Sequence, residues 1–218
     1  MRQGCVLKDY YEDGVGALKR DYLSDLNKSL KEEINQLFSK EIPLVFGDGD
    51  PNAGIVLIGE APGKNEVLQG KPFVGQAGKN LNEFIDILEI QREDLYITNV
   101  VKMRPYKINA DTGRESNRPP TRKEIQLFST YLMKELYILQ PKLLVTLGNV
   151  ALKTMTQNEN AMIGDFHGKP IEISVEEETY LLFPLYHPAS IIYKADLKGT
   201  YLEDLQKLRD YIRKQKIV

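Results

Sequence analysis

The sequence predicts a single α/β domain of three layers, in which a central, mostly parallel sheet lies between two layers of helices. Short apolar runs typical of buried strands recur along the chain, and segments with apolar residues at helical spacing separate them. Such alternation is typical of a parallel sheet that is covered on both faces. No Pro-, Gly- or Ser-rich linker divides the 218 residues, a length that suits one domain with a sizeable core.

The expected elements follow from these runs in order. Five apolar or β-branched runs predict strands, at residues 54–58, 95–101, 143–147, 171–174 and 180–185. Five amphipathic or capped segments predict helices, at residues 21–38, 75–88, 121–139, 149–155 and 200–213. The third helix is predicted to begin with a capping box, Thr121-x-x-Glu124. A polar loop is expected from about Met103 to Pro120.

Composition bounds the class of protein. No apolar run is long enough to span a bilayer and the first residues lack a signal-peptide segment, so we expect a cytoplasmic protein without membrane contact. A monomer is the default expectation. The only cysteine, Cys5, excludes an intrachain disulfide and a cysteine-only metal cage. The net charge of −2 gives no global nucleic-acid footprint, so any contact with DNA must use a local patch.

Three informative segments lie at the carboxyl ends of predicted strands: residues 59–63 (Gly-Glu-Ala-Pro-Gly) after the first, Asn99 at the second and His187 after the last. Because ligands bind at the carboxyl ends of strands in such sheets, we expect these segments to share one site. The glycine loop can cradle an anion or a carbonyl through its amides, or it is a plain strand-to-helix turn. It is not a P-loop, because the Gly-Lys-Ser/Thr ending is missing, and it is not the dinucleotide fingerprint, because the glycine spacing differs.

The individual side chains leave alternatives open. Phe73, between a proline and a glycine turn, is either a rigid stacking surface for a flat base or a core residue. Asn99 is suited to read a pyrimidine edge, or it caps a turn. His187 is suited to donate to an oxygen that becomes negative, or it is an exposed loop residue. The apolar residues at 191–193 either wedge into a base stack or begin a packed helix. No His, Asp or Glu cluster has the spacing of metal ligands.

Five motifs occur in one order along residues 45–192, and together they resemble the family 4 uracil-DNA glycosylases, bacterial and archaeal repair enzymes. Each motif is modest alone, and the ordered set is specific. They are Gly-Glu-Ala-Pro-Gly (59–63), Lys-Pro-Phe-Val-Gly-x-Ala-Gly (71–78), Thr-Asn-Val-Val-Lys-x-Arg-Pro (98–105), Asn-Arg-x-Pro-Thr-x-x-Glu-Ile (117–125) and His-Pro-Ala (187–189).

The resemblance implies a fold and a set of roles. The sheet would have four strands, mostly parallel. Phe73 would stack on a flipped uracil, Asn99 would bind its edge and His187 would lie against uracil O2. The remaining substrate-binding positions would be Ala61, Gly63 and Glu66. Glu60 and Asn117 would join His187 as catalytic residues, and Pro188, Ala189, Ser190 and Ile191 would enter the minor groove.

The implied activity is hydrolysis of the N-glycosidic bond of uracil in single- or double-stranded DNA, which leaves an abasic site. Ala61 occupies the position of a water-activating aspartate in the best-known relatives and cannot act as a base. Two other classes stay open: a DNA-binding protein of the same superfamily that has lost turnover, and a nucleotide or nucleoside hydrolase on a similar scaffold.

The chain also departs from the family. Family 4 enzymes usually bind a [4Fe-4S] cluster through four cysteines, whereas Met103 and Phe128 stand at two of those positions and a helical segment within residues 1–40 replaces the expected Cys-x-x-Cys region. Cluster irons need thiolates, so we predict that no cofactor is bound. Residues 106–116 resemble an insertion, interpreted as a mobile surface loop or, through Lys107 and Arg114, as a contact with the DNA backbone.

Overall fold

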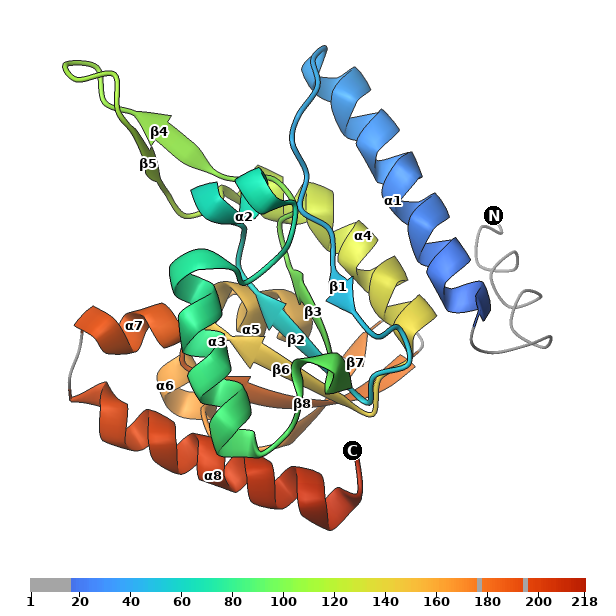
Figure 1. Ribbon diagram of the computed structural model, residues 1–218, viewed down its shortest axis with the longest axis vertical. Helices are drawn as coiled ribbons and strands as arrows, with labels where there is room; N and C mark the ends of the chain where they lie inside the picture. Colours follow the sequence, from blue (N-terminus) through green and yellow to red (C-terminus); the bar gives the residue numbers. More distant parts are fainter. Residues whose placement is uncertain (1–16, 176–177, 194–195) are drawn as a thin grey trace.

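A computed structural model describes residues 17–175, 178–193 and 196–218 (Figure 1). Cys5 lies outside these ranges. The described chain forms one mixed α/β domain, in which a central sheet is flanked by helices, as the sequence predicts. No helix in this part of the chain combines the length and the apolar character that a membrane span requires.

The central sheet has the strand order β1-β3-β2-β6-β8-β7. Its four inner strands run parallel, and they are β3 (Leu95–Asn99), β2 (Ile55–Gly59), β6 (Leu143–Leu147) and β8 (Glu178–Leu185). The edge strands β1 (Asp48–Gly49) and β7 (Ile171–Val175) are antiparallel to their neighbours.

The expected four-stranded sheet is therefore wrong in number, because the sheet has six strands. The four inner strands match the parallel core that the resemblance implies. β1 is only two residues long and pairs with β3 through Asp48 and Gly49, so no apolar run marks it in the sequence. β7 has a partly exposed, alternating pattern typical of an antiparallel edge strand.

The inner strands β2, β3 and β6 are buried on both faces along their whole length, and β8 is buried over its last four residues, which explains their apolar runs. Val56 and Ile58 of β2 pack on one side of the sheet, with α1 (Ala17–Phe38), α4 (Arg122–Leu139) and α5 (Gly148–Thr156). Ile55 and Leu57 pack on the other side, with α3 (Gly75–Leu88) and α8 (Leu197–Gln215). Successive side chains of a strand point to opposite faces, so one five-residue run supplies both cores.

Helix α4 begins as the sequence predicts. The Thr121 hydroxyl accepts a hydrogen bond from the Glu124 amide at 3.2 Å, and the Glu124 carboxylate accepts one from the Thr121 amide at 2.6 Å. These two bonds satisfy two amides that the first turn of a helix leaves without partners. Helix α1 packs against α4 on the outside of the domain (Figure 1).

Several short elements were not expected. The segment predicted as a polar loop contains a β-hairpin of β4 (Tyr106–Ile108) and β5 (Glu115–Asn117), which projects from the domain (Figure 1). Its exposed, polar strands lack the apolar alternation that identifies a strand in sequence. The other unexpected short helices are α2 (Lys64–Gln69), the 3-10 helix η2 (Arg92–Asp94) and α6 (Ile163–Phe166). A helix at residues 191–193 was one of the alternatives that the sequence left open, and these residues lie in α7 (Pro188–Tyr193).

Candidate active site

A cavity of about 340 Å³ lies at the carboxyl ends of the inner strands. It brings together seven of the residues predicted from sequence, which come from five separate segments of the chain. The lining residues are Ala61, Gly63, Lys64, Asn65, Glu66, Phe73, Asn99, Asn117 and His187. Of the three predicted catalytic residues, Glu60 is the one that this lining does not include.

Gly59 allows the side chains of Asn99 and Phe73 to approach each other. It ends β2 and is paired in register with Asn99, the last residue of β3. A Cβ on Gly59 would collide with Asn99 Oδ1 and would come within 2.7 Å of the Phe73 ring. Glycine at this position therefore allows the Asn99 amide and the Phe73 ring to meet over the strand end.

The rest of the glycine loop is held by its own side chains and backbone. The Gly63 amide donates to Glu66 Oε2 at 3.1 Å, and Glu66 is only 7% exposed. Val101 N donates to the Glu60 carbonyl at 3.0 Å, which ties the loop to the segment after β3. Glu60 itself is half-buried, and burial raises the pKa of its carboxyl above the ordinary value. Glu66 is thus engaged by the loop, whereas Glu60 carries a carboxyl with a raised pKa next to the cavity wall.

Phe73 combines the two interpretations that its sequence context left open. It is 4% exposed and belongs to the apolar cluster beneath α3, yet it also lines the cavity. Its φ of 51° is left-handed, a conformation that a bulky residue rarely adopts. Its ring centroid lies 6.3 Å from that of His187, with the planes 30° apart. The cavity therefore has an aromatic wall whose position is fixed by packing.

The backbone carbonyl of Asn99 belongs to a buried network of hydrogen bonds and an ion pair that was not predicted from the sequence. Lys102 Nζ donates to the Asn99 carbonyl at 2.9 Å, to Thr98 Oγ1 at 2.5 Å and to Glu135 Oε2 at 2.6 Å. The side chains of Lys102 and Glu135 are 3% and 2% exposed. A lysine directly after a buried strand is the only signal in the sequence, because Glu135 lies 33 residues away on α4. The network holds the last two residues of β3 in place.

His187 lies two residues beyond the end of β8, and its protonation state follows from its surroundings. The Ala189 amide donates to His187 Nδ1 at 3.1 Å, so Nδ1 is an acceptor and the ring proton of the neutral form is on Nε2. Burial lowers the pKa of His187 to about 4. At neutral pH the side chain is therefore an uncharged imidazole with one donor, Nε2–H.

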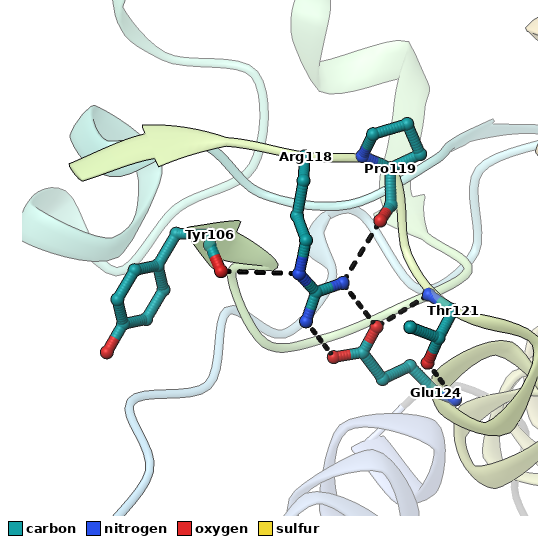
Figure 2. Close-up of polar contacts among 5 residues, drawn as sticks. All are labelled: Tyr106, Arg118, Pro119, Thr121 and Glu124. Atoms are coloured by element: carbon teal, nitrogen blue, oxygen red, sulfur yellow. Dashed lines mark hydrogen bonds and ion pairs between the residues drawn. The ribbon is translucent and has the colours of Figure 1, made fainter. Parts of the chain in front are cut away.

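Asn117 ends β5 and reaches the cavity from the hairpin. Arg104 Nε donates to Asn117 Oδ1 at 2.8 Å, while Arg104 Nη1 pairs with Glu115 Oε2 at 2.6 Å. Figure 2 shows the neighbouring network at the base of the hairpin, where Arg118 pairs through two nitrogens with Glu124. Arg118 Nε also donates to the carbonyl of Tyr106 on the opposite strand, at 3.2 Å.

The segment expected to enter a minor groove forms the start of α7. Pro188, Ala189 and Ser190 follow His187 directly, and α7 packs against α3 and α8. Ile191 belongs to the same helix, but its side chain lies outside the described part of the structure. The other histidine, His167, is not part of the cavity lining; its Nδ1 lies 2.5 Å from Oδ2 of the buried Asp204.

Several proteins named Type-4 uracil-DNA glycosylase are similar to this chain. The protein from Sulfurisphaera tokodaii is 37% identical over 195 residues, which cover 85% of this chain and 84% of the relative. The one from Archaeoglobus fulgidus is 32% identical over 198 residues, covering 89% and 94%. The one from Saccharolobus solfataricus is 37% identical over 177 residues, covering 79% and 78%.

These relatives correct the expectation about the cofactor. The prediction that none is bound is wrong as it stands, because it was drawn from the missing cysteines alone, whereas the relatives are Type-4 enzymes, the family in which a cluster is usual. Within residues 17–175, 178–193 and 196–218, no group of three or more His, Cys, Asp or Glu is placed to hold a metal. Met103 and Phe128 are buried in the apolar core and offer no thiolate. The described residues therefore do not fit a four-thiolate cluster.

Family membership follows from the whole matched region and agrees with the motifs around the cavity. A sequence model described as the Uracil DNA glycosylase superfamily matches residues 46–208, from the segment before β1 to the middle of α8. This range includes every residue of the cavity lining. The chain therefore belongs to the uracil-DNA glycosylase superfamily.

Proposed function

We propose that the protein removes uracil from DNA by hydrolysing the N-glycosidic bond, which leaves an abasic site in an intact strand. The observation that carries this proposal is a single cavity lined by an aromatic ring, a strand-end amide and a neutral imidazole, in a chain of this superfamily. Its volume of about 340 Å³ lies within the range of small-ligand pockets, so it suits one flipped nucleobase better than a stretch of stacked bases.

Substrate binding begins with extrusion of the nucleotide, which costs a few kcal/mol of unstacking and unpairing. In our proposal the Phe73 ring recovers part of this cost by stacking on the base. Asn99 offers both a donor and an acceptor, which match the carbonyl and the N–H on the uracil edge. Ala61, Gly63 and Glu66 form the remaining wall of the cavity.

Bond cleavage leaves negative charge on the uracil, and His187 is proposed to stabilise it. A neutral imidazole with its proton on Nε2 donates to uracil O2, and it needs no proton transfer during the step. Donors that are preorganised toward a developing anion are worth about 2.7–4 kcal/mol each in other enzymes. The backbone bond from Ala189 holds the ring in the required tautomer.

Water must then add to the sugar, and Ala61 offers no group to orient it. Glu60 and Asn117 are the two candidates we propose for this task. Glu66 is the weaker candidate, because its Oε2 already accepts from the Gly63 amide. Burial raises the pKa of Glu60, which makes its carboxylate a stronger base than an exposed one.

We further propose that residues 188–191 at the start of α7 approach the minor groove, because they follow His187 directly along the chain and His187 lines the cavity. We also propose that the protein acts on both single- and double-stranded DNA, that it is a cytoplasmic monomer, and that residues 1–218 form a single domain. These proposals rest on the composition and on the family resemblance.

The test is excision from oligonucleotides that contain one uracil, single- or double-stranded, followed by alkali to cleave abasic sites. We expect strand cleavage that depends on both uracil and alkali, with none on a thymine control. Salt-sensitive DNA binding without cleavage would instead support a DNA-binding protein without turnover. Activity on free nucleotides alone would support a nucleotide hydrolase.

A further inference from the structure

Arg104 links the hairpin to the cavity without lining the cavity itself. It lies five residues beyond Asn99, and its side chain is 12% exposed. Its three partners are Asn117 Oδ1, Glu115 Oε2 and the ring of Tyr106, whose centroid is 5.2 Å from the guanidinium carbon. All three belong to β4 and β5, so one side chain holds both strands of the hairpin.

The donors of the Arg104 guanidinium determine which atom of the Asn117 side-chain amide faces it. A guanidinium has five N–H donors and no acceptor, so only the oxygen of an amide can face it. The amide nitrogen must then point away from Arg104. A Cβ on Gly63 would lie 3.3 Å from Asn117 Nδ2 and 2.7 Å from Glu66 Oε2, so the nitrogen reaches the glycine loop that lines the cavity.

We propose that Arg104 is a positioning residue, which turns the Asn117 amide nitrogen into the cavity so that it donates a hydrogen bond to an oxygen of the extruded nucleotide. This inference rests on the proposed uracil excision. It assigns Asn117 a donor role toward the nucleotide in place of orienting the water. Of the two candidates proposed for orienting the water, Glu60 then remains.

The base of the hairpin supports this arrangement. Arg118, the residue after Asn117, pairs with Glu124 at 2.7 and 2.8 Å and donates to the Tyr106 carbonyl at 3.2 Å (Figure 2). The Arg118 amide also donates to the Pro105 carbonyl at 3.1 Å. Asn117 is therefore held at its side chain by Arg104 and along its backbone by the anchored hairpin. The hairpin thus holds Asn117, a residue of the cavity lining, in position.

A double-mutant cycle tests whether Arg104 acts through Asn117. The substitutions are Arg104→Gln, Asn117→Ala and both together, and single-turnover excision rates and DNA affinities are measured separately. We expect Asn117→Ala to slow excision about ten- to hundredfold, the loss typical of one hydrogen bond to a polar or charged partner. Arg104→Gln should give a smaller loss, and the double variant should lose no more than Asn117→Ala alone. Losses that multiply in the double variant would overturn the proposal.

A second measurement does not depend on activity. Asn117→Asp places a carboxyl beside Arg104, and NMR titration measures its pKa with and without Arg104→Gln. We expect Arg104 to hold that pKa about 1 to 3 pH units lower than in its absence. Excision by Asn117→Asp should be poor at neutral pH and recover on acidification, as the protonated carboxyl regains a donor. This recovery should move to higher pH when Arg104 is replaced.

Arg122→Gln is the matched control, because it removes an arginine that is 90% exposed on α4 and lies 3.9 Å from Glu159. It should change neither the introduced pKa nor the rate. The proposal would be overturned if the pKa of the carboxyl introduced by Asn117→Asp were the same with and without Arg104→Gln. It would also be overturned if the Asn117→Asp variant were fully active at neutral pH. If the pKa responds to Arg104 but the wild type releases no uracil, the proposed function fails while the Arg104–Asn117 contact stands.

Discussion

Two of the walls of the cavity are built by different physical means. The strand wall, formed by the ends of β2 and β3 and by His187 after β8, rests on parallel strands that are buried on both faces. The hairpin wall, formed by Asn117 at the end of β5, rests on ion pairs and hydrogen bonds of partly exposed side chains. The apolar core of the protein therefore holds the strand wall in place, whereas polar side-chain contacts hold the hairpin wall.

This difference predicts how substitutions in each wall affect stability and activity. Changes beneath the strand wall alter buried groups that water cannot reach, so their energetic cost is high. Changes in the hairpin wall alter pairs that solvent screens, so they cost little stability and act mainly on geometry. Substitutions in the two walls should therefore separate loss of stability from loss of activity.

The largest effect is expected at the buried pair below Asn99. Glu135→Leu leaves the Lys102 ammonium buried without its carboxylate, and breaking such a pair typically costs about 3–5 kcal/mol. Urea unfolding should show this loss in the free energy of unfolding. The double variant with Lys102→Met should recover much of it, since no charge is then buried. A double variant as unstable as Glu135→Leu would contradict this account.

The next effect is on chemistry. His187→Ala removes the proposed donor to uracil O2, so excision should slow by about 10²–10³ while DNA affinity changes little. Single-turnover rates and fluorescence-anisotropy binding measure the two separately. His167→Gln serves as the control, because the chain's other histidine lies outside the cavity lining, against Asp204. Equal losses of rate and affinity would reject the assigned role.

A smaller effect is expected at Gly59. In Gly59→Ala the new Cβ collides with Asn99 Oδ1 and approaches the Phe73 ring, an overpacking that typically costs about 1–3 kcal/mol. The free energy of unfolding should fall, and uracil excision should fall with it as the two side chains are pushed apart. Gly199→Ala on α8 is the control, since its Cβ would meet no atom within 4 Å. A Gly59→Ala variant with wild-type stability and rate would show that the contact is not tight.

The smallest effect is expected in the hairpin wall. Hydrogen bonds from Arg118 lower the pKa of Glu124 to about 2. A carboxyl whose folded pKa is depressed stabilises the fold above its unfolded pKa of 4.5, and this contribution is lost as pH falls from about 4.5 to about 2. Because the pair is partly exposed, we expect only about 0.2–1 kcal/mol.

Arg118→Gln should remove this part of the acid dependence of stability, as measured by thermal unfolding between pH 2 and 6. At neutral pH its cost in stability should stay well below that of Glu135→Leu. A cost as large as that of Glu135→Leu would mean that the hairpin wall is as deeply anchored as the strand wall.

The strand wall was largely predictable from sequence. Continuous apolar runs identified the inner strands, and the rule that parallel strands end at one edge placed Gly59, Asn99 and His187 together. The hairpin wall was not predictable in the same way. β4 and β5 are exposed and polar, and their pairing depends on Arg104 and Arg118, whose partners are visible only in three dimensions.

By itself the sequence determined the α/β class, the order of the main elements, the family and most residues of the cavity, because these follow from periodic burial and from short motifs along the chain. Only the tertiary structure decided the strand β1, the antiparallel edge position of β7, the Lys102–Glu135 pair near Asn99, the neutral Nε2–H form of His187 and the orientation of the Asn117 amide. Each of these depends on a contact between residues of different segments or on burial, and a linear pattern does not encode either one.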